Sequence, residues 1–341
     1  MLRPMLTRRT LLALPLALAG GLAHAQRERM PPLRRVFPDE DRLELRWHDP
    51  ARGREIPLRL RLPAGSGPVP LVLFSHGLGG GLGAGSLWSQ AWAAAGIATL
   101  HLQHPGSDLA VMRQGLRALK KAASPEQLRA RVLDVKAVLD QLPARQRERE
   151  DLRRLRLDAI GMAGHSFGAH TTLALAGQRF RGQALGADER PRAFAAFSPS
   201  PGTAGVAPAE SFGDIRQPTL CLTGSLDGDP LGDGSNDARE TRGDWRRAVY
   251  DALPAGDKAE LWLDGADHRV FGGMELQRLP LPPPLRERPT QAEAQTARHQ
   301  ALIAAVSTDW WRAQLLGDAA ARERLAQPPS TLGAQDAWRR G

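Results

Sequence analysis

The chemistry most legible in this sequence lies at residues 164–168, which read Gly-His-Ser-Phe-Gly and match the pattern G-x-S-x-G. An apolar run precedes the pattern and a helical pattern follows it, so Ser166 would occupy a turn from strand into helix. Such a turn is so tight that small residues must flank the serine, whose hydroxyl then projects into open space. In a chain with 35 glycines the bare pattern is weak, and the strand-turn-helix context makes it specific. We predict that Ser166 is a nucleophile; the alternative is a structural glycine turn.

A serine hydroxyl needs a base to remove its proton, and a carboxylate must orient that base. After a turn of this type, the acid and then the histidine come later in the chain, each following a later strand. Of the nine histidines, only His268 and His299 lie beyond the region of the acid, and His299 falls within a predicted helix. We therefore predict His268 as the base. We predict Asp227 as the acid, since it follows the expected strand 219–223 closely, with Asp229 as its alternative.

Two backbone N–H groups would have to stabilise the oxyanion of a tetrahedral intermediate. One is expected from Phe167, the residue after the nucleophile. The other is expected from residues 74–81, Phe-Ser-His-Gly-Leu-Gly-Gly-Gly, a glycine-rich loop of the histidine-glycine type after a buried strand. We predict Leu78 as this donor and Gly79 as its alternative.

Other polar patterns do not predict a metal or a cofactor. Residues 227–233 begin like a calcium loop, but Leu231 stands at the third ligand position and no closing glutamate is in register. His101 and His104 flank the end of a strand without a third zinc ligand nearby. No Gly-Lys-Ser/Thr follows the glycine-rich loop, which disfavours a phosphate-binding role. His76 and His165 are expected to be structural neighbours of the site.

Short apolar runs alternate with helical patterns from residue 42 onward, which predicts an α/β fold with a mostly parallel central sheet and helices on both faces. The first two runs alternate polar and apolar residues, as antiparallel strands at the edge of a sheet do, whereas Val69–Phe74 is continuously apolar, as a buried strand is. Strands are predicted at residues 43–47, 56–62, 69–74, 97–102, 159–163, 193–197, 219–223 and 259–263. Helices are predicted at 87–95, 125–142, 167–176, 244–253, 296–316 and 318–327.

The first 25 residues are predicted to be a signal peptide rather than part of the fold. Three arginines without an acid precede an apolar run, and Ala23-His24-Ala25 has the small-x-small pattern of a cleavage site before Gln26. Residues 7–12, Thr-Arg-Arg-Thr-Leu-Leu, resemble a twin-arginine export signal. We therefore expect a periplasmic or secreted protein whose residues 26–341 form a single domain. The single cysteine, Cys221, excludes an intrachain disulfide.

The basic composition does not predict a nucleic-acid partner. Removing the three arginines of the signal would lower the formal net charge from +9 to +6, and the remaining arginines are interleaved with acids. The apolar run near the N-terminus is shorter than the roughly 20 residues that a bilayer crossing needs, so stable membrane insertion is not expected. The expected partner is a small ester or lipid-like molecule, and the oligomeric state is left open.

Three segments together resemble a known family of enzymes. They are residues 70–79, 164–168 and 266–273, and the similarity by pattern runs from about Val69 to Leu325. The chain resembles the α/β-hydrolases related to dienelactone hydrolase and platelet-activating-factor acetylhydrolase. This resemblance implies a serine esterase without a large lid that acts on short or oxidised acyl chains, lactones or related esters. Dienelactone hydrolases proper have a cysteine nucleophile, and here Ser166 stands in that place.

The sequence therefore predicts an exported serine hydrolase that cleaves carboxylic esters through an acyl-enzyme. An amidase or peptidase with the same three residues is the first alternative, and a non-catalytic binding protein of the same fold is the second. Acyl and alcohol specificity would depend on how loops 200–217 and 269–295 cover the site, which the sequence alone leaves open.

Overall fold

A computed structural model describes residues 42–202, 206–232, 238–274 and 290–341. The predicted signal peptide and parts of both predicted covering loops, 203–205 and 275–289, lie outside the described residues. A nine-stranded sheet forms the centre, in the order β1-β2-β4-β3-β5-β8-β9-β10-β11. These strands are β1 Arg42–Asp49, β2 Arg54–Arg61, β3 Val69–Ser75, β4 Ala98–Leu102, β5 Leu155–His165, β8 Pro191–Phe197, β9 Thr219–Leu226, β10 Lys258–Asp267 and β11 Ala337–Arg340.

The directions of the eight predicted strands agree with the sequence prediction. The strands from β4 to β10 run parallel, whereas β1 and β2 pair antiparallel at the N-terminal edge and β2 also runs antiparallel to β4. Every residue of β3 is buried, as its continuous apolar run predicts, while β1 alternates buried and exposed residues over much of its length. The predicted α/β fold is therefore confirmed.

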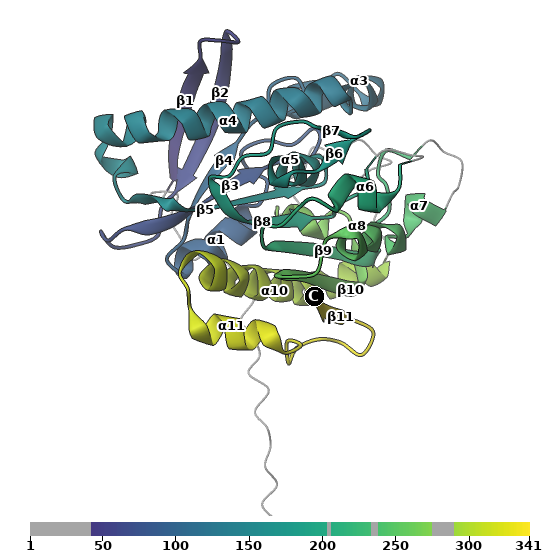
Figure 1. The fold of residues 1–341 in the computed structure, drawn as a ribbon. Helices are drawn as coiled ribbons and strands as arrows, with labels where there is room; N and C mark the ends of the chain where they lie inside the picture. The colour runs from purple at the N-terminus through teal and green to yellow at the C-terminus, as the bar shows by residue number, and fades with distance from the viewer. Residues whose placement is uncertain (1–41, 203–205, 233–237, 275–289) are drawn as a thin grey trace, which may run out of the picture. The chain divides into compact units, whose positions relative to one another are not determined.

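Helices cover both faces of the sheet (Figure 1). On one face α4 (Pro125–Glu148) and α5 (Phe167–Ala176) pack on the sheet. The shorter helices α6 (Pro208–Phe212) and α8 (Ala248–Ala252) contribute to the same apolar cluster. On the other face lie α1 (Ser86–Ala94), α10 (Thr290–Leu315) and α11 (Ala319–Ala326). Each face has its own apolar cluster, and the tryptophans of the second cluster, Trp88, Trp92, Trp310 and Trp311, are fully buried.

Several elements differ from their predicted form. Helix α4 was expected to end at Leu142 but continues through Pro143 to Glu148, because a proline inside a helix removes one hydrogen bond without always ending it. The predicted helix 244–253 is a 3-10 turn, η3 (Asp244–Arg247), followed by α8. The chain was expected to end in helices, yet β11 follows α11 and pairs antiparallel with β10.

Further short elements have no counterpart in the prediction. They are α2 Leu109–Met112, α3 Leu116–Ala122, η2 Glu150–Leu152, β6 Arg179–Phe180, β7 Gln183–Ala184, α6 within the predicted loop 200–217, α7 Ala238–Thr241 and η4 Val270–Gly272.

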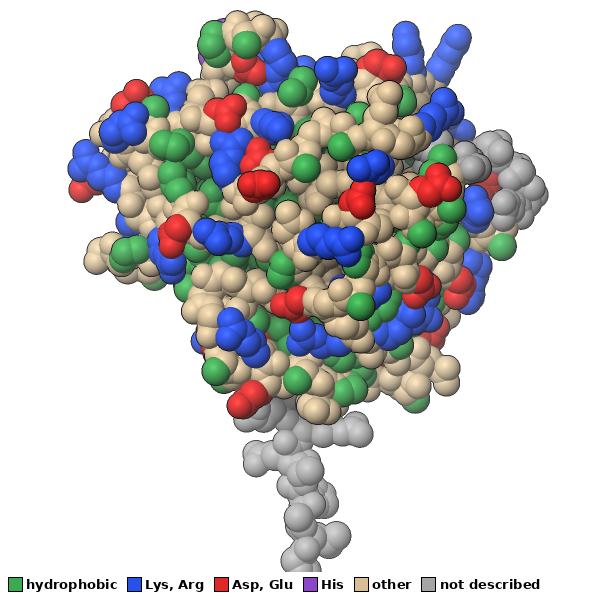
Figure 2. All heavy atoms as spheres, in the orientation of Figure 1, with side chains coloured by type: hydrophobic (Ala, Val, Ile, Leu, Met, Phe, Trp, Pro, Cys, Tyr) green, Lys and Arg blue, Asp and Glu red, His purple; other side chains and the backbone are tan. Residues whose placement is uncertain are grey.

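The surface carries both signs of charge. Figure 2 shows basic and acidic side chains interspersed on the face that it displays. Ion pairs between exposed or partly exposed side chains include Arg145 with Glu148 and Arg324 with Asp309. This mixture is unlike the continuous basic stripe of a nucleic-acid-binding surface. Within the described ranges, no helix combines the length and the apolar character that a membrane span requires.

Candidate active site

Ser166 lies at a strained turn between β5 and α5. Its backbone has φ 56° and ψ −116°, a left-handed φ that a residue with a side chain seldom adopts. The flanking glycines are sterically required: a Cβ on Gly164 would lie 2.2 Å from the carbonyl oxygen of Gly168, and one on Gly168 would lie 1.9 Å from that of Ser75. The turn thus has the geometry that the G-x-S-x-G pattern predicts, with Ser166 partly exposed.

Asp227 is completely buried directly after β9 and is hydrogen-bonded through both carboxylate oxygens. Oδ1 lies 2.7 Å from Nδ1 of His268, and Oδ2 accepts a hydrogen bond from the Thr223 hydroxyl at 2.8 Å. Asp229, the alternative acid, is exposed, and its carboxylate accepts the backbone N–H of Leu231 instead. The structure therefore brings Asp227, and not Asp229, to the imidazole.

The hydrogen bond to Asp227 determines which nitrogen of His268 is available. A carboxylate can only accept, so Nδ1 of His268 carries a proton and donates it. In the neutral ring, Nε2 then holds a lone pair. His268 is partly exposed, with 14% of its side chain accessible. It can therefore accept a proton at Nε2 at the surface of the molecule while its other nitrogen stays anchored in the interior.

Arg246, in η3, is a buried cation beside this pair that the sequence analysis did not identify. Its Nε lies 3.1 Å from Oδ1 of Asp227, and its Nη2 lies 3.4 Å from Nδ1 of His268. The guanidinium also donates to the carbonyls of Asp227, Gly228 and Ser198. Burial raises the pKa of the Asp227 carboxyl, but the charges of Arg246 and His268 outweigh burial and lower this pKa to about 2. Asp227 is consequently ionised at neutral pH.

His165, the residue before Ser166, connects the turn at Ser166 to the loop that carries His268. In the sheet, β8 and β9 separate β5 from β10. Nevertheless, Nε2 of His165 donates a hydrogen bond to the carbonyl of His268 at 3.0 Å, and the two rings lie 4.7 Å apart. Burial lowers the pKa of His165 to about 3, so its ring is neutral and serves as a structural neighbour of the site. No hydrogen bond of the Ser166 hydroxyl is found among the described residues.

The glycine-rich loop after β3 lies against the Ser166 turn. A Cβ on Gly77 would approach Cβ of Ser166 to 3.4 Å. Gly79 donates its N–H to the carbonyl of Ser107 at 2.8 Å, so this alternative oxyanion donor is already engaged. For the N–H of Leu78 no acceptor is found within the described part of the chain. Phe167 is the first residue of α5, and the first N–H groups of a helix have no acceptor within the helix.

A second serine-histidine-aspartate set, formed by Ser75, His104 and Asp134, lies beneath this loop. Nε2 of His104 is 3.0 Å from the Ser75 hydroxyl, and Nδ1 is 2.9 Å from Asp134. All three residues are fully buried, so a substrate cannot reach this serine. From the sequence, His104 was interpreted only as a weak candidate for a zinc ligand. Within the described residues, no group of three or more histidine, cysteine or acidic side chains could hold a metal ion.

No protein-family model and no curated protein matches the sequence. Solved structures do. One of them is the native structure of a novel cold-adapted esterase from an Arctic intertidal metagenomic library, with a TM-score of 0.47 and 14% sequence identity. The alignment covers 80% of this chain and 93% of that one.

Thr223 and Arg246 both hold Asp227 in place, but only one of them could have been predicted from the sequence. Thr223 lies on β9, four residues before Asp227, and a hydroxyl so close in sequence could have been predicted as its partner. Arg246 lies 19 residues later, and nothing in the local sequence separates it from the exposed arginines around it. Its role follows only from the tertiary structure.

Proposed function

We propose that this protein is a serine hydrolase that cleaves carboxylic esters through an acyl-enzyme, with Ser166 as nucleophile, His268 as base and Asp227 as the acid that orients the base. The observation that carries this proposal is the 2.7 Å hydrogen bond between Asp227 and Nδ1 of His268. It leaves the Nε2 lone pair of His268 available, in a loop bonded to the residue that precedes Ser166.

In the first half of the reaction, the Ser166 hydroxyl attacks the ester carbonyl carbon while Nε2 of His268 takes its proton. The tetrahedral intermediate collapses as the imidazolium returns this proton to the leaving alkoxide, so an alcohol departs and the acyl group stays on Ser166. In the second half a water molecule repeats the attack with the same base, and the carboxylic acid leaves. Asp227 remains ionised throughout and stabilises the imidazolium. The hydroxyl-imidazole hydrogen bond needed for the first step is one that commonly tightens when substrate binds.

The N–H groups of Leu78 and Phe167 are proposed to bind the oxyanion of both intermediates. Support comes from the contact between the loop and the turn at Gly77 and Ser166, and from the hydrogen bond that occupies the Gly79 N–H. Donors already fixed in place need no reorganisation as charge develops on the carbonyl oxygen.

The test is the hydrolysis of p-nitrophenyl esters of increasing acyl length, from acetate to laurate, by the wild-type protein and by Ser166→Ala. We expect turnover of at least one ester by the wild type, and a loss of at least about 10⁴-fold in kcat in the variant with an unchanged circular dichroism spectrum. Turnover retained by the variant would contradict the proposal. Matching p-nitroanilides distinguish the amidase alternative, because amide cleavage needs protonation of a poorer leaving group.

We also propose that residues 1–25 direct export of the folded protein and are then removed. The order of arginines, apolar run and cleavage pattern supports this. N-terminal sequencing of protein from the periplasm of a bacterial host should begin at Gln26, and replacement of both Arg8 and Arg9 by lysine should keep the precursor in the cytoplasm. An intact N-terminus on exported protein would contradict cleavage.

A further inference from the structure

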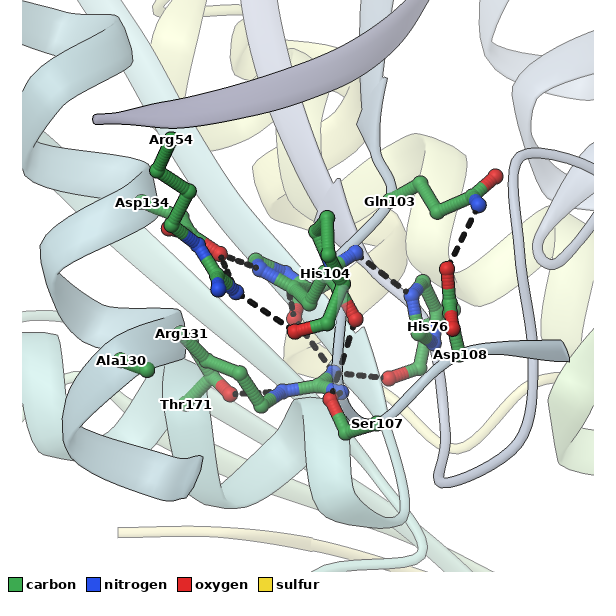
Figure 3. A network of polar contacts seen from close by, with 12 residues as sticks. Arg54, His76, Gln103, His104, Ser107, Asp108, Ala130, Arg131, Asp134 and Thr171 are labelled. Carbon is green, nitrogen blue, oxygen red and sulfur yellow. Dashed lines mark hydrogen bonds and ion pairs between the residues drawn. The ribbon is translucent and has the colours of Figure 1, made fainter. Parts of the chain in front are cut away.

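The buried set of Ser75, His104 and Asp134 continues into Arg131 of α4, and these four residues are here called the buried cluster. Figure 3 shows His104, Arg131 and Asp134 of this cluster. Nη2 of Arg131 donates to the Ser75 hydroxyl at 3.0 Å. The Asp134 carboxylate receives two further hydrogen bonds from Arg54, at 2.7 and 3.0 Å. All four members of the cluster are completely buried. A set so fully shielded from substrate calls for a role other than catalysis.

The charges of the buried cluster fix the direction of its hydrogen bonds. Burial raises the pKa of Asp134, but His104 and Arg54 outweigh burial and lower this pKa to about 2, so the carboxyl is ionised. Burial, reinforced by the charge of Arg131, lowers the pKa of His104 to about 4, so its ring is neutral at pH 7. Arg131 therefore donates to Ser75, Ser75 to His104, and His104 to Asp134. Each donor in this chain meets an acceptor, which favours a single rigid arrangement.

Arg131 also connects the two segments that carry the proposed oxyanion donors. Its Nη2 donates a short hydrogen bond to the carbonyl of His76, which begins the loop of Leu78. Its Nε donates at 3.0 Å to the hydroxyl of Thr171 in α5, the helix that Phe167 begins. The guanidinium carbon lies 4.8 Å from the centre of the Phe167 ring. One planar side chain thus spans both halves of the proposed oxyanion hole.

The remaining polar groups of the loop are held by its neighbours. Nε2 of His76 accepts the N–H of His104 at 3.0 Å, and Nδ1 therefore donates to the carbonyl of Gly77. Gly79 donates to the carbonyl of Ser107, and the hydroxyl of Ser107 accepts from Arg131 at 2.9 Å. The backbone is consequently fixed on both sides of Leu78, whose N–H finds no acceptor among the described residues.

We propose that Arg131 is the positioning residue of the oxyanion hole, and that the buried cluster exists to hold its guanidinium in place. This inference rests on the proposed hydrolase function. Arg131 touches neither substrate nor reacting atoms; it sets the separation of the Leu78 and Phe167 N–H groups before substrate arrives. Lysine keeps the positive charge but lacks the planar set of donors that reaches His76, Ser107 and Thr171 together.

The test compares Arg131→Lys with Arg61→Lys, the same change at an arginine that is also buried, at the end of β2. For the best p-nitrophenyl ester we expect kcat to fall by roughly 10²–10³-fold in Arg131→Lys, with KM changed less than about threefold. Inhibition by an alkyl trifluoromethyl ketone should weaken by a similar factor, because addition of the Ser166 oxygen to its carbonyl carbon turns the carbonyl oxygen into an oxyanion in the hole. Arg61→Lys should change neither value by more than about twofold.

Ser75→Ala provides a second variant if Arg131→Lys does not fold. It removes the hydroxyl that links Arg131 to His104 and leaves the guanidinium bonded to the loop, so we expect the same change in a milder form, about tenfold in kcat and in ketone affinity. A folded Arg131→Lys or Ser75→Ala protein with wild-type kcat and ketone affinity overturns the positioning role. Wild-type protein that hydrolyses no ester overturns the proposed function instead, and this distinguishes the two failures.

Discussion

At the scale of residues, the candidate site depends on one strained backbone and one buried carboxylate. Ser166 keeps a left-handed φ because β5 and α5 fix both sides of the turn, and such strain in a folded protein is typical of functional positions. Asp227 stays ionised because Arg246 and His268 compensate its burial. The candidate site thus combines a partly exposed serine and histidine with a fully buried carboxylate.

Replacing Asp227 by asparagine should lower kcat for the best ester on the order of 10³–10⁴-fold. The amide can present its NH₂ to His268 and so favour the tautomer in which Nε2 carries the proton. The exposed Asp229, changed to asparagine, is the matched control and should retain wild-type kcat. A larger loss of kcat in the Asp229 variant than in the Asp227 variant would show that Asp229, and not Asp227, is the acid. Steady-state kinetics at pH 7.5 provides the measurement.

The three proposed catalytic residues were predictable because chain order and strand ends restrict them, whereas their supports were not. Order along the chain reduced nine histidines to His268 and His299. The burial of Arg246 and Arg131 could not be predicted, because the burial of an arginine depends on elements distant in sequence. The sequence holds many arginines, and only the tertiary structure shows which two are enclosed beside the site.

At the scale of elements, the best-predicted segments are those with a long, uniform pattern. Strand β3 was predicted almost to its ends, because its continuous apolar run is visible in the local sequence. Helix α5 was predicted equally well, because the glycine-flanked serine marks its start. The short helices α2 and α3 and the strand β11 were missed, since a few residues without a clear period take their structure from tertiary contacts. Strand β11 forms because β10 has a free edge with which it pairs.

The contact between α5 and the end of β3 depends on a glycine. Gly168→Ala should lower the free energy of unfolding by at least about 2 kcal/mol, because the added methyl group would lie 1.9 Å from the carbonyl oxygen of Ser75. Displacement of the turn should also lower kcat by roughly 100-fold. Gly67→Ala is the control, since no atom lies within 4 Å of its new methyl group. Equal urea midpoints and equal activity for the two variants would contradict the close contact seen here.

At the scale of the whole molecule, burial of histidine makes folding stability depend on pH. Burial lowers the pKa of His101 and His165 to about 3 and that of His104, His170 and His299 to about 4. In the unfolded chain these rings bind protons below about pH 6.5, while in the folded protein they remain neutral. The unfolded state therefore binds more protons between these pH values, and stability falls as pH falls from about 6.5 to 4.

Urea unfolding at pH 8, 6.5, 5 and 4 checks this expectation. The contribution of these histidines to the free energy of unfolding should be nearly constant from pH 8 to 6.5. It should then decrease as the pH is lowered from 6.5 to 4. Each ring contributes at most about 1.4 kcal/mol per pH unit. His101→Asn should reduce the slope, because its amide can replace the hydrogen bond from Nδ1 to the carbonyl of Ala84 without titrating. A midpoint independent of pH between 6.5 and 4 would show that the buried rings do not resist protonation. The carboxyls of Asp134 and Asp227, with pKa values of about 2, lose their contribution only below about pH 4.

The most direct test is to label the protein with a fluorophosphonate and locate the adduct by peptide mass spectrometry. The reagent phosphonylates an activated serine. Among the described residues, Ser166 is the proposed nucleophile, and Ser75 is the serine that is hydrogen-bonded to a histidine-aspartate pair. We predict one adduct per chain on Ser166, none on the buried Ser75, and none in Ser166→Ala. An adduct on Ser75, or equal labelling of wild type and Ser166→Ala, would contradict the assignment of the nucleophile.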